Sequence, residues 1–261
     1  MSKVLYDDIG VTYDNTRCTD PFITETIINL LDCSIHSKIL DIACGTGNYT
    51  TALYTKGFDI TGVDISDVMI KKAKEKCPNI SWICNNADHI ELESGLFDGA
   101  VCTLACHHFP DLHAVFSEVY RLLNKGKFVI LSCTHLQIRN YWLYHYFPEV
   151  LEYMITYMPD IDVMIKALVD SGFRLRSLVP YYITPETKDN FFGSRIEQPE
   201  LYLNEGFRSG MSIFAEKANP LDIELGCLRL ESELKSGAFD NHIRTHKNHF
   251  GDYIFITVEK L

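Results

Sequence analysis

A glycine-rich turn followed by a single carboxylate is the part of the sequence best suited to chemistry. Residues 39–64 are typical of a strand that ends in a turn from Asp41 to Gly47, then a helix, then a second strand ending at Asp64. Glycines such as Gly45 let the backbone approach a ligand closely, and a carboxylate at the tip of the second strand can bind both ribose hydroxyls. The spacing therefore predicts a nucleotide or nucleoside site.

The kind of nucleotide follows from what the turn lacks. A dinucleotide fingerprint requires Gly or Ala three positions after Gly47, and this chain has Thr50 there. The sequence also has no Tyr-x-x-x-Lys pair and no Gly-Lys-Ser/Thr phosphate loop. A nucleoside ligand without phosphates is favoured, and an oxidoreductase that uses a nicotinamide cofactor is the less favoured alternative.

Three histidines follow predicted strands and are candidates for acid–base work, because imidazole titrates near neutral pH. They are His107, His108 and His135. A second group of candidates depends on the later part of the chain folding over the site. It consists of His242, His246 and His249. Each of these side chains could equally be structural or exposed.

Short apolar runs alternate with helical patterns, as in a sheet whose parallel strands are buried on both faces. Five such runs and two later ones lie at 38–43, 58–64, 80–84, 97–103, 127–133, 173–183 and 253–258. Helical patterns lie at 47–56, 67–76, 111–123 and 160–171. In the clearest helix, Asp111 is the expected N-cap and Gly126 the expected turn after the helix. The alternation predicts an α/β fold with a doubly wound, Rossmann-like sheet of seven strands.

Two segments after the fifth strand are predicted to form a cap. Residues 135–159 are rich in aromatics, and residues 184–249 are too long for a structureless loop in a compact domain. A helix is expected to begin at Asn219-Pro220 and end at Gly237, with one apolar face consisting of Leu221, Leu225 and Leu228. The two segments could roof a small apolar pocket, or their aromatics could be ordinary core. Residues 1–261 are interpreted as one domain with a helical insertion between the sixth and seventh strands.

Composition disfavours several classes of protein. The 261 residues include 24 Lys and Arg against 35 Asp and Glu, a net charge of −11, which argues against a nucleic-acid partner. Nine cysteines without a Cys-x-x-Cys pair indicate a reducing, cytoplasmic location. Cys102 and Cys106, beside the histidine pair, lack zinc-ligand spacing, so no metal site is predicted. No apolar signal core or membrane-spanning run is seen in the sequence.

Four motifs in order resemble the class I S-adenosylmethionine-dependent methyltransferases. They are Asp-x-Ala-Cys-Gly-Thr-Gly from Asp41, Val-Asp-Ile-Ser-x-x-Met from Val63, Ala87-Asp88, and Leu-Ala-Cys-His-His-Phe-Pro-Asp from Leu104. The similarity is to the small-molecule branch that includes ubiquinone/menaquinone-biosynthesis and trans-aconitate-type enzymes. It covers residues 6–134 well and the rest only through strand order. It implies that the seventh strand lies antiparallel between the fifth and sixth.

The resemblance implies which residues bind the cofactor S-adenosyl-L-methionine and its product S-adenosyl-L-homocysteine. The methionine part would be lined by Asp41, Ala43, Gly45, Gly47 and the backbone of Leu104. Ala43 stands where many relatives have glycine. The ribose would be held by Asp64 and flanked, with the adenine, by Ile65 and Met69. The adenine amino group would meet Asp88 within the sequence Ala87-Asp88-His89.

The N-terminal residues Tyr6, Tyr13 and Arg17 match a Tyr-Asp-x-x-Arg start of this branch. In that reading Arg17 could pair bidentately with the cofactor carboxylate. Alternatives remain for several of these residues, because Asp41 could cap a helix, Asp88 could be a surface acid and Arg17 could be solvated.

The resemblance implies in-line transfer of a methyl group to a small-molecule acceptor. This reaction needs alignment, and it needs a base only if the acceptor loses a proton. One of His107, His108 and His135 is then the expected base or acceptor-orienting group. A monomer or weak homodimer is expected. The alternative from another class is a module that binds the cofactor without catalysis.

Overall fold

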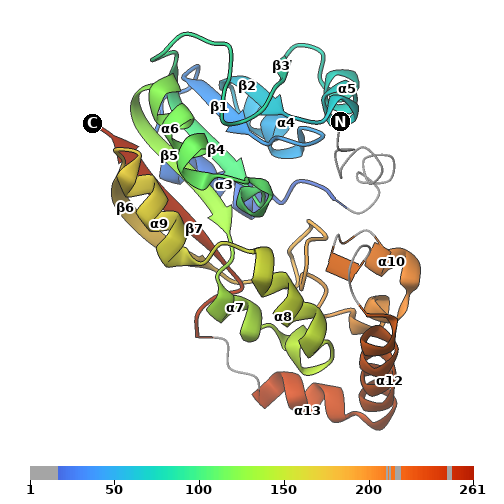
Figure 1. The fold of residues 1–261 in the computed structure, drawn as a ribbon. Helices are drawn as coiled ribbons and strands as arrows, with labels where there is room; N and C mark the ends of the chain where they lie inside the picture. The colour runs from blue at the N-terminus through green and yellow to red at the C-terminus, as the bar shows by residue number, and fades with distance from the viewer. Residues whose placement is uncertain (1–16, 210, 212, 215–218, 246–248) are drawn as a thin grey trace.

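The seven strands form one sheet in which only β7 runs antiparallel to the others, within the residues described. The computed structural model describes residues 17–209, 211, 213–214, 219–245 and 249–261. Its strands are β1 (Lys38–Ile42), β2 (Asp59–Asp64), β3 (Ser81–Cys84), β4 (Phe97–Thr103), β5 (Leu123–Ser132), β6 (Arg174–Tyr181) and β7 (Tyr253–Lys260). The order is β3-β2-β1-β4-β5-β7-β6, and β7 pairs antiparallel with both β5 and β6 (Figure 1). The predicted Rossmann-like sheet is confirmed.

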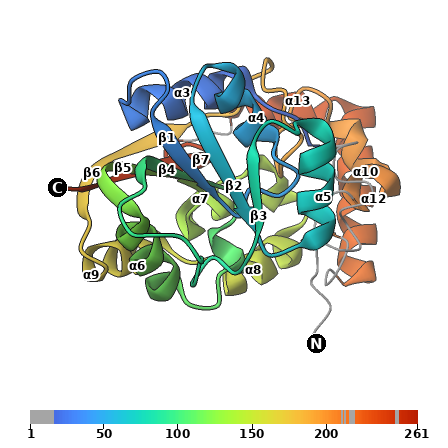
Figure 2. The same cartoon turned by 90° about the horizontal axis from the view of Figure 1, so that it is seen from above.

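Helices cover both faces of this sheet (Figure 2). One face carries α3 (Pro21–Leu31), α4 (Asn48–Thr55) and α5 (Asp67–Lys76), and the other carries α6 (Leu112–Leu122) and α9 (Ile161–Asp170). Ile27 and Leu53 belong to the apolar core on the first face, and Phe116 and Phe128 to the core on the second. Burial on both faces explains why the central strands are nearly continuous apolar runs.

Capping residues fix the helix ends where the sequence predicted them. The Asp111 carboxylate accepts a hydrogen bond from the Ala114 amide at 3.0 Å, at the start of α6. Asn219 accepts from the Leu221 amide at 3.1 Å and begins α12 (Pro220–Ser236). Gly237 ends that helix in the left-handed conformation, which a glycine adopts without steric cost.

The connection from α6 to β5 differs from the prediction. Strand β5 begins at Leu123, directly after the helix, so no separate turn follows α6. Gly126 instead lies within the strand, at φ +118°, where the pairing of β5 with β4 shifts its register. A Cβ at this position would lie 2.0 Å from the carbonyl oxygen of Asp98. The glycine therefore permits an irregularity in the sheet and not a helix exit.

Apart from η1 (Cys106–His108), which follows β4, the other helices described gather at the carboxyl ends of the parallel strands and form a cap (Figure 1). They are α7 (His135–Arg139), η2 (Trp142–His145), α8 (Pro148–Tyr157), η3 (Pro199–Leu203), α10 (Glu205–Ser209), α12 and α13 (Ala238–Thr245). Aromatic residues from both predicted cap segments share one core, and the Tyr141 and Phe192 ring centroids lie 5.7 Å apart. Much of the aromatic content is therefore packed interior.

Helix α12 packs through a glycine, and its predicted apolar face is exposed. Leu221, Leu225 and Leu228 are each more than half exposed. The close contact is made by Gly226, where a Cβ would lie 2.3 Å from the Phe147 ring. At 17 residues α12 is the longest helix described, and no helix in the described ranges has the length and apolar character needed to cross a membrane.

Candidate functional site

A cavity of about 200 Å³ lies at the carboxyl ends of β1, β2, β3 and β4. Strand order reverses between β1 and β4, and such a switch point is where ligands bind in open α/β sheets. The loops after these four strands supply its wall. The lining residues are Ala43, Gly45, Val63, Asp64, Ile65, Met69, Asn85, Asn86, Ala87, Thr103, Leu104, Ala105, His108, Phe109 and Pro110.

The backbone around the cavity adopts left-handed conformations at several positions. Ala43, Gly45 and Leu104 have φ values of +55°, +56° and +55°. A Cβ on Gly45 would meet nothing within 4 Å, so this residue leaves open space beside the cavity. Gly47, at φ +74°, lies against the Trp82 ring, only 2.2 Å from where its Cβ would be. The first glycine therefore gives a ligand access, and the second lets the turn pack on β3.

Asp64 is fixed at the cavity wall by two backbone amides. Its Oδ2 accepts from Gly45 at 2.8 Å, and its Oδ1 accepts from Ser66 at 2.9 Å. The first bond ties the tip of β2 to the turn after β1. The structure thus brings together the glycine turn and the carboxylate that the sequence paired.

Asp41 lies beneath the turn and does not line the cavity. Its side chain is buried, and its Oδ2 accepts a 2.6 Å hydrogen bond from the Thr50 hydroxyl. Its Oδ1 is buried without a hydrogen-bond partner. Burial raises the pKa of this carboxyl from about 3.8 to about 7, while the Thr50 hydrogen bond opposes the rise. Such a group is poised to respond to a nearby cation.

The cavity end formed by β2 and β3 mixes apolar and amide groups. Ile65, Met69 and Ala87 line it as predicted. Asp88 and His89 are exposed and lie outside its lining. Asn85 and Asn86 also line it, and neither belongs to the motifs quoted from the sequence. The signal was present, because this amide pair directly follows β3.

His107 and His108 form a pair of rings at the end of β4. Their centroids lie 3.8 Å apart, and the His107 ring lies 6.0 Å from that of Tyr157 on α8. His108 lines the cavity, whereas His107 is outside the lining and lies near Tyr157 of the cap. Desolvation by the surrounding protein lowers the pKa of both imidazoles, and the charge of Arg17 adds to the effect at His107. Both rings are therefore neutral at pH 7.

His135 lies elsewhere. Its Nε2 is 2.7 Å from the carbonyl oxygen of Met158, and its Nδ1 is 3.6 Å from the Asp160 carboxylate. The ring joins the start of α7 to the loop between α8 and α9 and is not part of the cavity lining. His242 stacks on His145 within the cap, with centroids 4.3 Å apart, and His246 lies outside the described residues.

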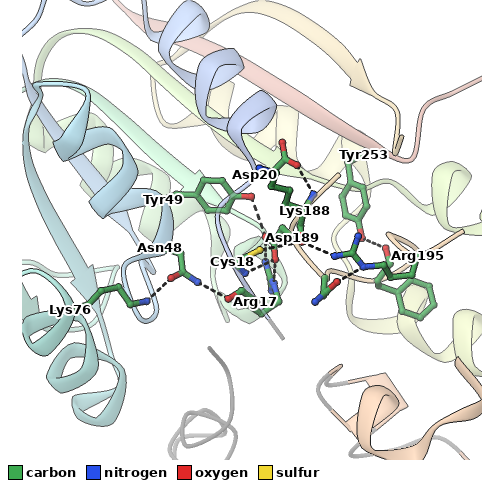
Figure 3. A network of polar contacts seen from close by, with 12 residues as sticks. Arg17, Cys18, Asp20, Asn48, Tyr49, Lys76, Lys188, Asp189, Arg195 and Tyr253 are labelled. Atoms are coloured by element: carbon green, nitrogen blue, oxygen red, sulfur yellow. Dashed lines mark hydrogen bonds and ion pairs between the residues drawn. The ribbon is translucent and has the colours of Figure 1, made fainter. Parts of the chain in front are cut away.

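Arg17 pairs with a carboxylate of the protein itself. Its Nε and Nη2 donate to the two carboxylate oxygens of Asp189 at 2.7 and 2.9 Å. Figure 3 draws this pair. This is a bidentate pair with a carboxylate of the protein, and the expected pairing of Arg17 with the cofactor carboxylate stays a prediction. Tyr6 and Tyr13 lie outside the described residues.

Comparison with known proteins agrees with this geometry. The family model described as "Methyltransferase domain" matches residues 39–126. A putative methyltransferase from an antibiotic biosynthesis pathway of Anabaena variabilis is 31% identical, with a TM-score of 0.83 over 94% of this chain and 99% of that one. The geranyl diphosphate C-methyltransferase of Streptomyces coelicolor, 14% identical with a TM-score of 0.57 over 92% and 76% of the two chains, shares the fold. The chain belongs to the S-adenosylmethionine-dependent methyltransferase family.

This chain matches only part of the length of its curated relatives. The demethylmenaquinone methyltransferase of Beutenbergia cavernae is 23% identical over 133 residues, which are 49% of this chain and 55% of that protein. The chain thus spans about half the length of the curated relatives it matches.

Proposed function

We propose that the protein transfers the methyl group of S-adenosylmethionine to a small-molecule acceptor. The observation that carries this proposal is the cavity at the switch point, where the Asp64 carboxylate is tied to the open turn at Gly45. A carboxylate beside an open glycine turn is suited to a ribose next to an amino-acid chain. Family membership supports the same cofactor.

The residues present fit this cofactor. Asp64 would hold the ribose diol, and Met69, Ile65 and Ala87 would flank the adenine at the other end of the cavity. The amino-acid part would lie along the open space at Gly45. Asp41 lies beneath the turn, and its charge would favour the cationic end without lining the cavity, because its Oδ1 has no hydrogen-bond partner.

Arg17 is proposed to bind the cofactor carboxylate, in addition to its bond with Asp189. The Streptomyces enzyme was crystallised with S-adenosylhomocysteine, which places this class of ligand on the shared fold in that protein. The adenine amino group would lie near Asn85 and Asn86, with the exposed Asp88 and His89 beyond them.

In methyl transfer the main task of the protein is to align the acceptor with the methyl group. The bound cofactor supplies an activated methyl group on a sulfonium. The protein must hold an acceptor in line with it and exclude water. A neutral imidazole at His107 or His108 would accept the proton of an O–H or N–H acceptor. Tyr157, beside His107, would then border the acceptor.

A small-molecule acceptor and a reducing location are part of the proposal. The Beutenbergia and Streptomyces relatives are named for small-molecule substrates, and the net charge of −11 disfavours a phosphate backbone. All nine cysteines are free thiols in the structure, which fits the cytoplasm. We propose a monomer or weak homodimer.

Thermal unfolding with S-adenosylhomocysteine, and with NAD as the control, tests the cofactor. A ligand at about 100 times its Kd adds roughly 2.7 kcal/mol to the stability of the native state. Since about 1 kcal/mol shifts Tm by roughly 2–4 °C at this size, a rise of several degrees is expected with S-adenosylhomocysteine alone. A rise only with NAD would overturn the proposal. Transfer of labelled methyl to a metabolite pool then separates an enzyme from a binding module.

A further inference from the structure

A buried ion pair joins the cap to the cofactor-binding half. The Asp189 side chain is only 1% exposed and that of Arg17 is 17% exposed. Asp189 also accepts from the Cys18 amide at 3.3 Å and from the Tyr49 hydroxyl at 3.1 Å. Four donors from two other parts of the chain therefore converge on one carboxylate. An exposed surface pair would contribute little, whereas a buried charge depends on every partner it has.

These donors come from residues beside the glycine turn. Tyr49 is in the first turn of α4, two residues after Gly47. Asn48 donates to the Arg17 carbonyl at 3.4 Å, and its own carbonyl accepts from the Thr19 hydroxyl at 3.2 Å. The segment that carries Arg17 thus runs along the start of α4 (Figure 3).

The other side of Asp189 belongs to a strap, residues 184–195, that leads from β6 into the cap. Within the strap, Arg195 donates to the carbonyls of Thr187 and Lys188 at 2.7 and 2.8 Å. Trp142 on η2 donates to the Gly193 carbonyl at 3.2 Å. The strap is therefore anchored to the cap at one end and to the cofactor-binding half through Asp189.

We propose that Asp189 is a positioning residue for the cofactor site, a role that rests on the proposed function. By holding Arg17, Cys18 and Tyr49, its carboxylate fixes residues 17–18 and the first turn of α4 against the strap. In the proposed placement these two elements border the amino-acid end of the cofactor. Loss of the carboxylate loosens binding at that end and spares the adenosine end at Asp64.

Two ligands measured by calorimetry on the full chain test this role. S-adenosylhomocysteine carries the amino-acid part, whereas 5′-methylthioadenosine lacks it. We expect Asp189→Asn to weaken S-adenosylhomocysteine at least about tenfold and 5′-methylthioadenosine less than about threefold. Hydrogen exchange should increase at residues 17–20 and 187–195. Asp170→Asn, which breaks an exposed pair with Lys166 on α9, is the matched control and should change neither affinity.

Tyr49→Phe is the second variant, because it removes one donor from Asp189 and leaves both charges in place. It should weaken S-adenosylhomocysteine about threefold even if Asp189→Asn fails to fold. The positioning role would be overturned if either variant lost affinity equally for both ligands. It would also be overturned if either variant bound S-adenosylhomocysteine as tightly as the wild type or more tightly. If the wild-type chain binds neither ligand, the proposed function fails as well, so the two failures are distinguishable.

Discussion

The Gly45 amide donates a 2.8 Å hydrogen bond to Oδ2 of Asp64, and this bond joins the turns after the first two strands. The residues are 19 positions apart, yet they form one wall of the cavity. The same carboxylate also receives the Ser66 amide at the start of α5. Asp64 therefore organises the turn backbone as well as facing the ligand.

Replacing Asp64 by alanine should weaken cofactor binding strongly. A hydrogen bond to a charged group contributes about 1.5–3 kcal/mol, so S-adenosylhomocysteine affinity should fall about 10- to 100-fold by calorimetry. Asp67→Ala, an exposed acid three residues later, is the control and should leave affinity within about threefold. Unchanged affinity in Asp64→Ala would refute the ribose assignment.

The two glycines of the turn should respond differently to alanine. Gly47→Ala forces a left-handed φ and a clash with Trp82, so urea unfolding should show a loss of about 2 kcal/mol or more. Gly45→Ala also has a positive φ but open space, so its loss should be about 1 kcal/mol. Gly45→Ala should nevertheless weaken S-adenosylhomocysteine. Equal stability of the two variants would contradict the packing described.

Asp41 should make stability depend on pH. Because its folded pKa is about 7 and its unfolded value is about 3.8, the folded chain holds a proton between these pH values that the unfolded chain has released. The free energy of unfolding therefore falls as pH rises from 4 to 7, by up to about 4 kcal/mol, and is level above that. Asp41→Asn should lose this fall when urea unfolding is compared at pH 4.5 and 8. If the free energy of unfolding changed with pH in the same way in the wild type and in Asp41→Asn, Asp41 would not be the source of the pH dependence.

His107, which lies outside the cavity lining, should matter for turnover and not for cofactor affinity. His107→Gln is expected to lower kcat about 10²- to 10⁴-fold for an acceptor that loses a proton. Because the pKa of His107 is lowered, wild-type activity should persist below pH 6.5. His135→Gln and the exposed His113→Gln are controls, measured by labelled methyl transfer. A kcat loss in His135→Gln equal to that in His107→Gln would argue against this site.

The contact at Gly226 should govern how α12 docks. Gly226→Ala places a Cβ against the Phe147 ring and the Tyr146 carbonyl, so overpacking should cost about 1–3 kcal/mol in urea unfolding. Leu225→Ala, one position earlier but exposed, should change stability by no more than about 0.5 kcal/mol. A larger loss in Leu225→Ala would mean that the leucine face is covered.

Local patterns predicted the sheet, because strands buried on both faces leave continuous apolar runs. They also put the glycine turn and Asp64 at the carboxyl ends of neighbouring strands, where the structure has them. A glycine after a helix usually ends it, so the sequence predicts a turn at Gly126, whereas the close approach of the Asp98 backbone is what requires glycine there. The sequence places His135 and His107 alike at strand ends, but in the structure the His135 ring contacts the Met158 carbonyl and lies outside the cavity lining.

No local sequence pattern predicts that Arg17 pairs with Asp189. Asp189 is 172 positions away, and nothing near it in the sequence marks it as a buried acid. Pairing over such a distance depends on how β6 ends and how the strap returns, which only the assembled sheet determines.

The distance in sequence between Arg17 and Asp189 limits when their ion pair can form during synthesis. Arg17 leaves the ribosome 172 residues before Asp189, and it cannot form this ion pair until the chain has grown past residue 189, at about 5–20 residues per second. Closing so long a loop is entropically costly unless the strands between its ends have already paired. A nascent chain that ends before residue 184 would contain the glycine turn and the residues of β1 to β6, but neither the strap nor β7, the strand with which β6 pairs. Attachment of residues 17 and 18 to Asp189 therefore follows synthesis of most of the cofactor-binding half.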